Sequence, residues 1–169
     1  EGSRDPRLTH PDRNPHDVMT DAAPSALTRA AFLGHGSPMN ALERNRYTEA
    51  WKDFGAAGPK PRVVLMVSAH WYIAATAMTA MAQPRTIHDF GGFPQALFDV
   101  RYPAPGMPAL VEEVAELLRP TPVLADARQW GLDHGSWSVL RHLYPAADVP
   151  VVQLSIDTRL TPAQHFELG

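Results

Sequence analysis

Five consecutive apolar residues, Val63 to Val67, limit the fold of this chain more than any other feature of its sequence. A run of this kind, rich in β-branched side chains, is typical of a strand that is buried on both faces. Such strands occur almost only in sheets that helices cover on both sides. We therefore predict a central sheet, to which Val149–Ile156, Thr76–Ala82 and Val123–Leu124 contribute further strands.

Segments between these strands carry apolar residues three or four positions apart, which is the spacing of an amphipathic helix. They are residues 47–54, 110–118 and 137–144, the last behind a predicted Ser136 cap. A fourth helix is predicted from Thr161, because Thr-Pro-Ala-Gln combines a capping box with proline at the first helical position. Strands and helices that alternate in this way predict an α/β domain with a mostly parallel central sheet flanked by helices.

Composition removes several classes of function. The chain has 169 residues and no cysteine, which excludes disulfides, thiolate zinc sites and cysteine nucleophiles. A transition metal would have to be held by His, Asp and Glu. The net charge of -3 and the lack of a basic run argue against a nucleic-acid partner. No apolar stretch is long enough to cross a membrane, so we expect no membrane partner and a cytoplasmic location.

The two ends of the sequence differ from its middle. Residues 1–28 hold four prolines and no aromatic residue, so we expect a disordered N-terminal arm. Residues 29–169 form the predicted domain. The helix predicted from Thr161 reaches only Gly169, which leaves its apolar face without a partner. We therefore expect that the domain is truncated at its C-terminal end or that a partner covers this helix.

Two of the eight histidines stand where a metal could bind. His35 follows the short apolar run of residues 30–33, and His70 follows the run that ends at Val67, 35 residues further along. That spacing is about the length of one βαβ unit, ~30 residues or more. Parallel strands end at the same edge of a sheet, where open α/β folds bind ligands. His35 and His70 are therefore candidate ligands of one divalent metal, although two loop histidines with ordinary hydrogen bonds would give the same pattern.

Other segments are candidates for proton transfer or substrate binding. His134 precedes a predicted helix, at the expected edge of a pocket. His165 lies in the first turn of the last predicted helix, where the helix dipole favours the neutral imidazole of a general base. His88 and Phe90 lie in a long loop predicted over residues 83–107, and they suit a lid over an apolar substrate. The alternatives are a surface histidine at 165 and a loop packed by its own aromatic side chains.

Seven short motifs occur in a fixed order between Arg29 and the last residue. They are LGHGSPM (33–39), SAHW (68–71), TIHDF (86–90), YPAPG (102–106), GLDHG (131–135), VVQLS (151–155) and HFELG (165–169). Together they resemble the class III (LigB-type) extradiol ring-cleaving dioxygenases, in particular the 4,5-DOPA dioxygenase branch. Any one motif would be a weak signal, whereas the ordered set is specific.

The resemblance implies an oxidoreductase that opens the ring of a small catechol, DOPA-like or protocatechuate-like, with O2. It implies a non-haem Fe(II) held by His35, His70 and a third ligand. In the family that ligand lies beyond the position of Gly169, so this chain would be the N-terminal two-thirds of the catalytic domain. Zn(II) could occupy the same ligands in purified protein, but it has no redox chemistry.

The resemblance also gives roles to the other candidates. It implies acid/base duty for His165 and a catalytic and substrate-binding place for His134. His88 and Phe90 stay candidate substrate-binding residues because of their place in the long loop. Two further functions stay open: a zinc-dependent hydrolase that uses the same two histidines and an activated water, and a catalytically inactive chain that binds metal weakly. The sequence is compatible with a monomer and with a homo-oligomer.

Overall fold

The computed structural model describes residues 30–169, and the compact unit discussed below is Leu33–Gly169. The predicted N-terminal arm, residues 1–28, lies outside the described residues. The centre of the unit is a sheet of strands β1 (Val64–Ile73), β2 (Ala77–Thr79), β3 (Leu124–Asp126) and β4 (Val151–Asp157), in the order β1-β4-β2-β3. The pairs β1–β4 and β2–β3 are parallel and β2–β4 is antiparallel. The predicted α/β fold with a mostly parallel sheet is confirmed.

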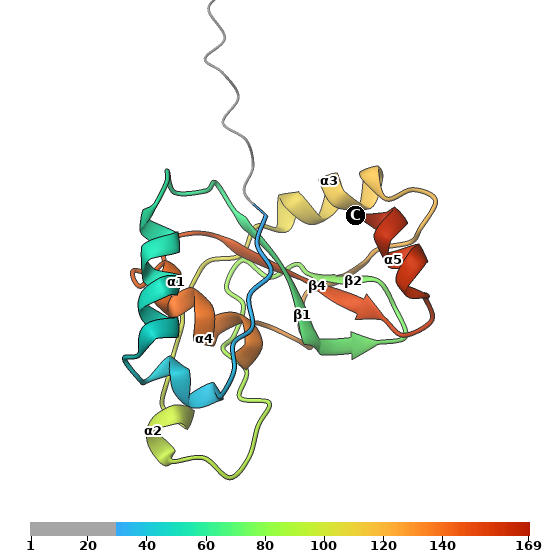
Figure 1. The fold of residues 1–169 in the computed structure, drawn as a ribbon. Helices are drawn as coiled ribbons and strands as arrows, with labels where there is room; N and C mark the ends of the chain where they lie inside the picture. Colours follow the sequence, from blue (N-terminus) through green and yellow to red (C-terminus); the bar gives the residue numbers. More distant parts are fainter. Residues whose placement is uncertain (1–29) are drawn as a thin grey trace, which may run out of the picture. The chain divides into compact units, whose positions relative to one another are not determined.

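Helices account for most of the remaining regular structure. They are α1 (Arg46–Ala56), α2 (Gln95–Phe98), α3 (Pro108–Leu117), α4 (His134–Leu143) and α5 (Pro162–Leu168), with a 3-10 helix, η1, at Pro38–Ala41. Figure 1 shows α1 beside α4, and α3 apart from them. No helix of residues 30–169 is both long and apolar enough to cross a membrane.

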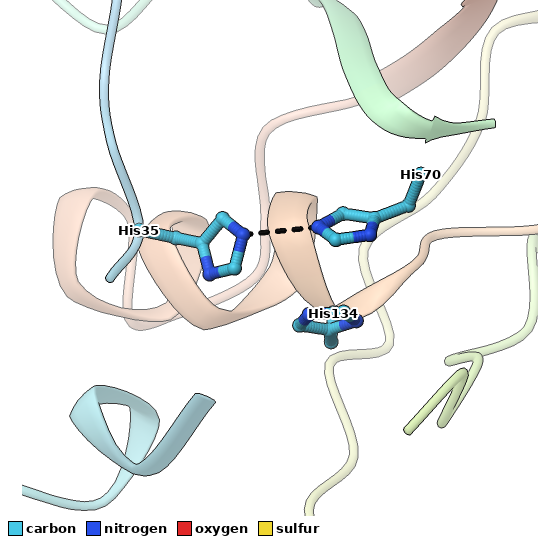
Figure 2. Close-up of side chains that lie close together, drawn as sticks. All are labelled: His35, His70 and His134. Carbon is cyan, nitrogen blue, oxygen red and sulfur yellow. Dashed lines mark hydrogen bonds between the residues drawn. The ribbon is translucent and has the colours of Figure 1, made fainter. Parts of the chain in front are cut away.

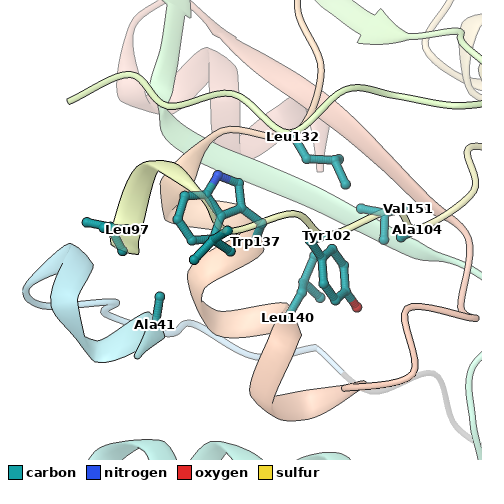
Figure 3. Close-up of a cluster of buried hydrophobic side chains, with 9 residues drawn as sticks. Ala41, Leu97, Tyr102, Ala104, Leu132, Trp137, Leu140 and Val151 are labelled. Atoms are coloured by element: carbon teal, nitrogen blue, oxygen red, sulfur yellow. The ribbon is translucent and has the colours of Figure 1, made fainter. Parts of the chain in front are cut away.

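One face of the sheet packs against α4. Its core contains the fully buried residues Trp137 and Leu140 of α4, Val151 of β4, and Tyr102 from the loop before α3 (Figure 3). The Trp137 indole donates a hydrogen bond of 2.7 Å to the carbonyl of Ile87, so its one polar atom is satisfied inside the core. This core fixes the position of α4, and therefore of the residues at its first turn.

The opposite face packs against α3. Val152 is the neighbour of Val151 in β4 and so points to the other side of the sheet. There it clusters with Met78 of β2 and Val111 of α3. β1 lies at one edge of the sheet, and its Leu65 pairs with Val152 on this same face. Leu65 and Val67 nevertheless remain exposed, since the helix does not cover the β1 edge.

Three local expectations are corrected by the structure. Residues 30–35 form no strand, so His35 follows an irregular segment. His70 lies inside β1, because that strand continues to Ile73 past a register irregularity between Val67 and Tyr72. The N-cap of α4 is Asp133, whose carboxylate accepts the Ser136 backbone N–H, and Ser136 itself is inside the helix.

The loop over residues 83–107 and the final helix are close to their predictions. The loop is long, but it includes α2 and a bridge between Thr86 and Leu132, which ties it to the segment before α4. Thr161 caps α5 in a full capping box with Gln164 and with proline at the first helical position, as predicted.

Candidate metal centre

His35 and His70 meet with their Nε2 atoms 2.9 Å apart, although they come from an irregular segment and from β1 (Figure 2). Without a metal, one ring donates a hydrogen bond to the other at this distance. The same distance suits two ligands of one ion, because nitrogens about 2.1 Å from a shared metal and at right angles about it are ~3.0 Å apart. The predicted meeting of these two histidines is therefore present in the structure.

His134, the first residue of α4, is the third ring of the group. Its ring centroid is 4.0 Å from that of His70 and 5.0 Å from that of His35. One candidate ligand atom from each of the three rings lies within 4.8 Å of the others. No hydrogen bond joins His134 to either ring among the described contacts, but its ring centroid is nearer to that of His70 than the His35 centroid is, at 5.1 Å, and all three rings are candidate metal ligands.

Hydrogen bonds to their backbone groups help to hold His35 and His70 in position. The side chain of Asn40, in η1, donates a hydrogen bond of 3.0 Å to the carbonyl of His35. Gly36 has a φ of +63°, a left-handed conformation that glycine adopts without strain, and it turns the chain from His35 into η1. On the other side, the backbone N–H of His70 donates to the hydroxyl of Ser68 at 3.2 Å.

Beneath the rings lies a buried polar network centred on Asp133. Its carboxylate accepts hydrogen bonds from Ser68 at 2.9 Å and from the side chain of Gln153. The hydroxyl of Ser136 lies within hydrogen-bond distance of both Asp133 and Gln153. The network joins β1, β4 and the start of α4, and its Ser68 also accepts the backbone N–H of His70. Asp133 is fully buried and occupied as a helix cap, which leaves it no free oxygen to offer a metal.

Electrostatics favour the neutral form of His35. Burial lowers its pKa below the usual 6.5, and the neighbouring rings of His134 and His70 lower it further. The neutral imidazole is the form that binds a metal. Nδ1 of His35 is buried and has no hydrogen-bond partner in the described residues, whereas Nε2 faces the centre.

Gly135 is the close neighbour of His70. A Cβ atom at position 135 would lie 2.6 Å from Cδ2 of the His70 ring, which no real contact allows. Glycine at position 135 therefore leaves the His70 ring where it is, and any side chain there would require the ring to shift.

Of the two predicted substrate residues in the loop, Phe90 contacts the three-ring group directly and His88 does not. The Phe90 ring packs edge-on against His134 with centroids 5.4 Å apart, and so borders the centre. His88 lies behind it, among Phe90, Phe98 and Trp137, and its Nε2 is 3.0 Å from the carbonyl oxygen of Val100. A substrate contact for His88 stays a prediction.

His165 is not part of the three-ring group. It lies in α5, and its Nε2 is 3.1 Å from the backbone oxygen of Asp157. One residue at the centre was not singled out from the sequence. Asp89 contacts both His134 and His70, and its only signal in the sequence was its place between His88 and Phe90 in a motif.

Comparison with known proteins identifies the family of the chain. The family model described as the catalytic LigB subunit of aromatic ring-opening dioxygenase matches residues 29–169. The chain is 59% identical over 140 residues to 4,5-DOPA dioxygenase extradiol of Escherichia coli K12, covering 83% of this chain and 52% of that protein. It is 37% identical over 145 residues to the Beta vulgaris protein of the same name, covering 82% and 53%.

A solved structure shows the same fold. The crystal structure of an uncharacterized protein of Escherichia coli K12 superposes with a TM-score of 0.63 at 47% sequence identity, covering 78% of this chain and 48% of that one. The chain belongs to the LigB family of aromatic ring-opening dioxygenases. It spans about half the length of the curated relatives that it matches.

Proposed function

We propose that this chain supplies the metal centre of an extradiol dioxygenase that opens the ring of a small catechol with O2. The single observation that carries the proposal is the 2.9 Å approach of Nε2 of His35 to Nε2 of His70 in a LigB family chain. Fe(II) bound there supplies the redox chemistry by which O2 reacts with a catechol. DOPA-like and protocatechuate-like catechols are the proposed substrates, in keeping with the names of the relatives.

His35 and His70 would hold the metal, and a third protein ligand would come from outside this chain. Three protein ligands leave positions of an iron site open for a substrate and O2. His134 is the alternative third ligand, since it is the only other candidate ring that the described residues bring within 4.8 Å. We favour a proton-transfer role for His134, in keeping with the catalytic place that the family resemblance implies for it.

The chain's own residues would handle the substrate and its proton. Nε2 of His134 would accept a proton from a catechol hydroxyl, while Nδ1 stays bonded to Asp89. The Phe90 ring, packed edge-on against His134, would limit access of water and contact the aromatic substrate. His165 enters the proposal as an acid/base group through the family resemblance alone.

Metal titration of single variants tests these assignments. His35→Ala and His70→Ala should each abolish calorimetric Zn(II) binding, and His165→Ala should leave the affinity within about 3-fold of the unmodified chain. His134→Ala separates its two roles, because a ligand is required for binding and a proton-transfer group is not. Loss of metal from His165→Ala as complete as from His35→Ala would contradict the division of roles.

Activity needs a polypeptide of full family length. We suggest a hybrid in which this chain is joined to the remaining half of the Escherichia coli relative. With Fe(II), air and a catechol, the hybrid should form a ring-cleavage product with its own visible absorbance, and the His35→Ala hybrid should form none. Turnover that needs Zn(II) but no O2 would favour the hydrolase instead.

Cytoplasmic location and the lack of a nucleic-acid partner remain predictions.

A further inference from the structure

Asp89 is a carboxylate that lies between two of the three rings. Its Oδ1 is 2.8 Å from Nδ1 of His134 and accepts a second hydrogen bond, of 3.0 Å, from the backbone N–H of the same residue. Its Oδ2 lies 3.8 Å from Nδ1 of His70. The side chain is 18% exposed, so these contacts are largely shielded from water.

We propose that Asp89 is a positioning residue that fixes the tautomer of His134, holding the proton on Nδ1 and the lone pair of Nε2 toward the metal centre. The inference rests on the proposed function for its consequence in catalysis. The tautomer itself can be observed in the chain without any metal.

The direction of the hydrogen bond follows from the chemistry of the two groups. An ionised carboxylate has no proton to donate, so Nδ1 of His134 must carry the hydrogen of this bond. A neutral imidazole has only one N–H, and Nε2 is therefore left with its lone pair. That is the arrangement required of a proton acceptor, and equally of a metal ligand.

The geometry itself shows that this oxygen of Asp89 is an acceptor. The backbone N–H of His134 can only donate, and it donates to Oδ1 of Asp89 at 3.0 Å. The same Oδ1 lies 2.8 Å from Nδ1 of His134 and is placed to accept its hydrogen as well.

The same carboxylate faces His70 from the side away from His35. Nε2 of His70 is directed at His35, while Nδ1 is on the Asp89 side. The 3.8 Å separation is too long for a direct hydrogen bond, so the effect on His70 is electrostatic. Carboxylates behind metal-binding histidines typically change metal affinity by 10–100-fold. We therefore expect Asp89 to strengthen binding at His70 as well as to orient His134.

Residues on both sides of Asp89 contact the core and so restrict the position of its backbone. On one side Ile87 accepts the indole N–H of Trp137, and on the other Phe90 packs among aromatic rings of the core. Partly buried residues on each side thus hold the segment that carries the carboxylate, although Asp89 lies outside any helix or strand.

Nitrogen NMR of the histidine-labelled chain, free of metal at pH 8, tests the proposal. His134 should show a protonated Nδ1 and an unprotonated Nε2. Asp89→Ala should shift the proton to Nε2, and Asp89→Asn should keep it on Nδ1, because the amide oxygen still accepts both bonds. Asp99→Ala, which removes an exposed carboxylate of the same loop, should change nothing. A proton on Nε2 in the unmodified chain overturns the proposal without any variant having to fold.

Zn(II) titration of the same proteins completes the test. Asp89→Ala should bind 10–100-fold more weakly than the unmodified chain, Asp89→Asn should lie between them, and Asp99→Ala should equal the unmodified chain. An unmodified chain that binds no metal would refute the proposed function, while the tautomer result would still stand. A chain that binds metal equally well with and without Asp89, or whose His134 tautomer ignores the substitution, would refute the inference alone.

Discussion

The imidazole of His70 occupies the space that a side chain at position 135 would need. A Cβ on Gly135 would lie 2.6 Å from Cδ2 and 3.1 Å from Nε2 of that ring. A side chain at position 135 would therefore force the His70 ring to move from its present position. The position of a candidate metal ligand thus depends on a residue that has no chemistry of its own.

Gly135→Ala should weaken Zn(II) binding by at least 10-fold, because the added methyl group pushes the His70 ring away from His35. Alanine in a helix is otherwise favourable by about 0.5–1 kcal/mol relative to glycine, so overall loss of helix is not expected. Calorimetric titration measures the affinity and circular dichroism monitors the fold. Gly91→Ala is the matched control, since a Cβ there meets nothing within 4 Å. Equal affinities of the two variants would contradict the steric argument.

Leu140→Ala should lower the free energy of unfolding by about 2–5 kcal/mol, because a fully buried side chain leaves a cavity against Trp137 and Val151. Leu117→Ala, at a leucine that is 81% exposed, should change it by no more than about 0.5 kcal/mol. Urea unfolding of the two variants gives both values. Similar losses would mean that the core is not where the structure has it.

Asp157 should stabilise the fold at neutral pH and lose this effect in acid. The hydrogen bonds from Arg159 outweigh burial and hold the pKa of Asp157 well below its usual value, and Thr76 adds a further bond. Since the folded pKa is below the unfolded value of about 3.9, the contribution is complete above about pH 5 and is lost progressively as the pH falls below that. The stability difference between the unmodified chain and Asp157→Asn should therefore shrink between pH 5 and pH 2. A difference that stays constant in urea unfolding over this range would refute the assignment.

The 169-residue chain alone, reconstituted with Fe(II), should show negligible oxygen uptake with L-DOPA or protocatechuate. Two imidazoles hold iron weakly, and the chain spans only about half the length of its relatives. An oxygen electrode makes the measurement, and the hybrid of full family length is the positive control. Robust turnover by the chain alone would show that a described residue, with His134 as the first candidate, completes the metal site.

The sequence predicted the layers of the fold because they depend on local patterns. The apolar run at Val63–Val67, the helical spacing in residues 110–118 and the capping box at Thr161 each describe a single element and correspond to β1, α3 and α5. The pairing of His35 with His70 was predicted for a partly incorrect reason. The segment before His35 is not a strand and His70 does not follow one, yet the topology still brings the two rings together.

Features that depend on distant contacts could not be predicted in this way. The Ser136 cap was wrong because Asp133, three residues earlier, is held in place by Ser68 and Gln153 of two strands. Asp89 was missed for a similar reason, since its role exists only where a loop passes a helix 45 residues further along the chain. The resemblance located the residues, but only three-dimensional packing shows which oxygen contacts which ring.

His70 lies in β1, the strand at the edge of the sheet, so the same strand carries a candidate metal ligand and an unpaired sheet edge. Its outer backbone groups are free of sheet partners in the described residues, and Leu65 and Val67 lie exposed beside them. Such an edge readily accepts a further strand from any source. A strand added there would stiffen the backbone that carries His70 and would change the affinity for metal. If copies of the chain pair at this edge, self-association and metal binding would be thermodynamically linked through one strand, and the metal affinity would then depend on protein concentration.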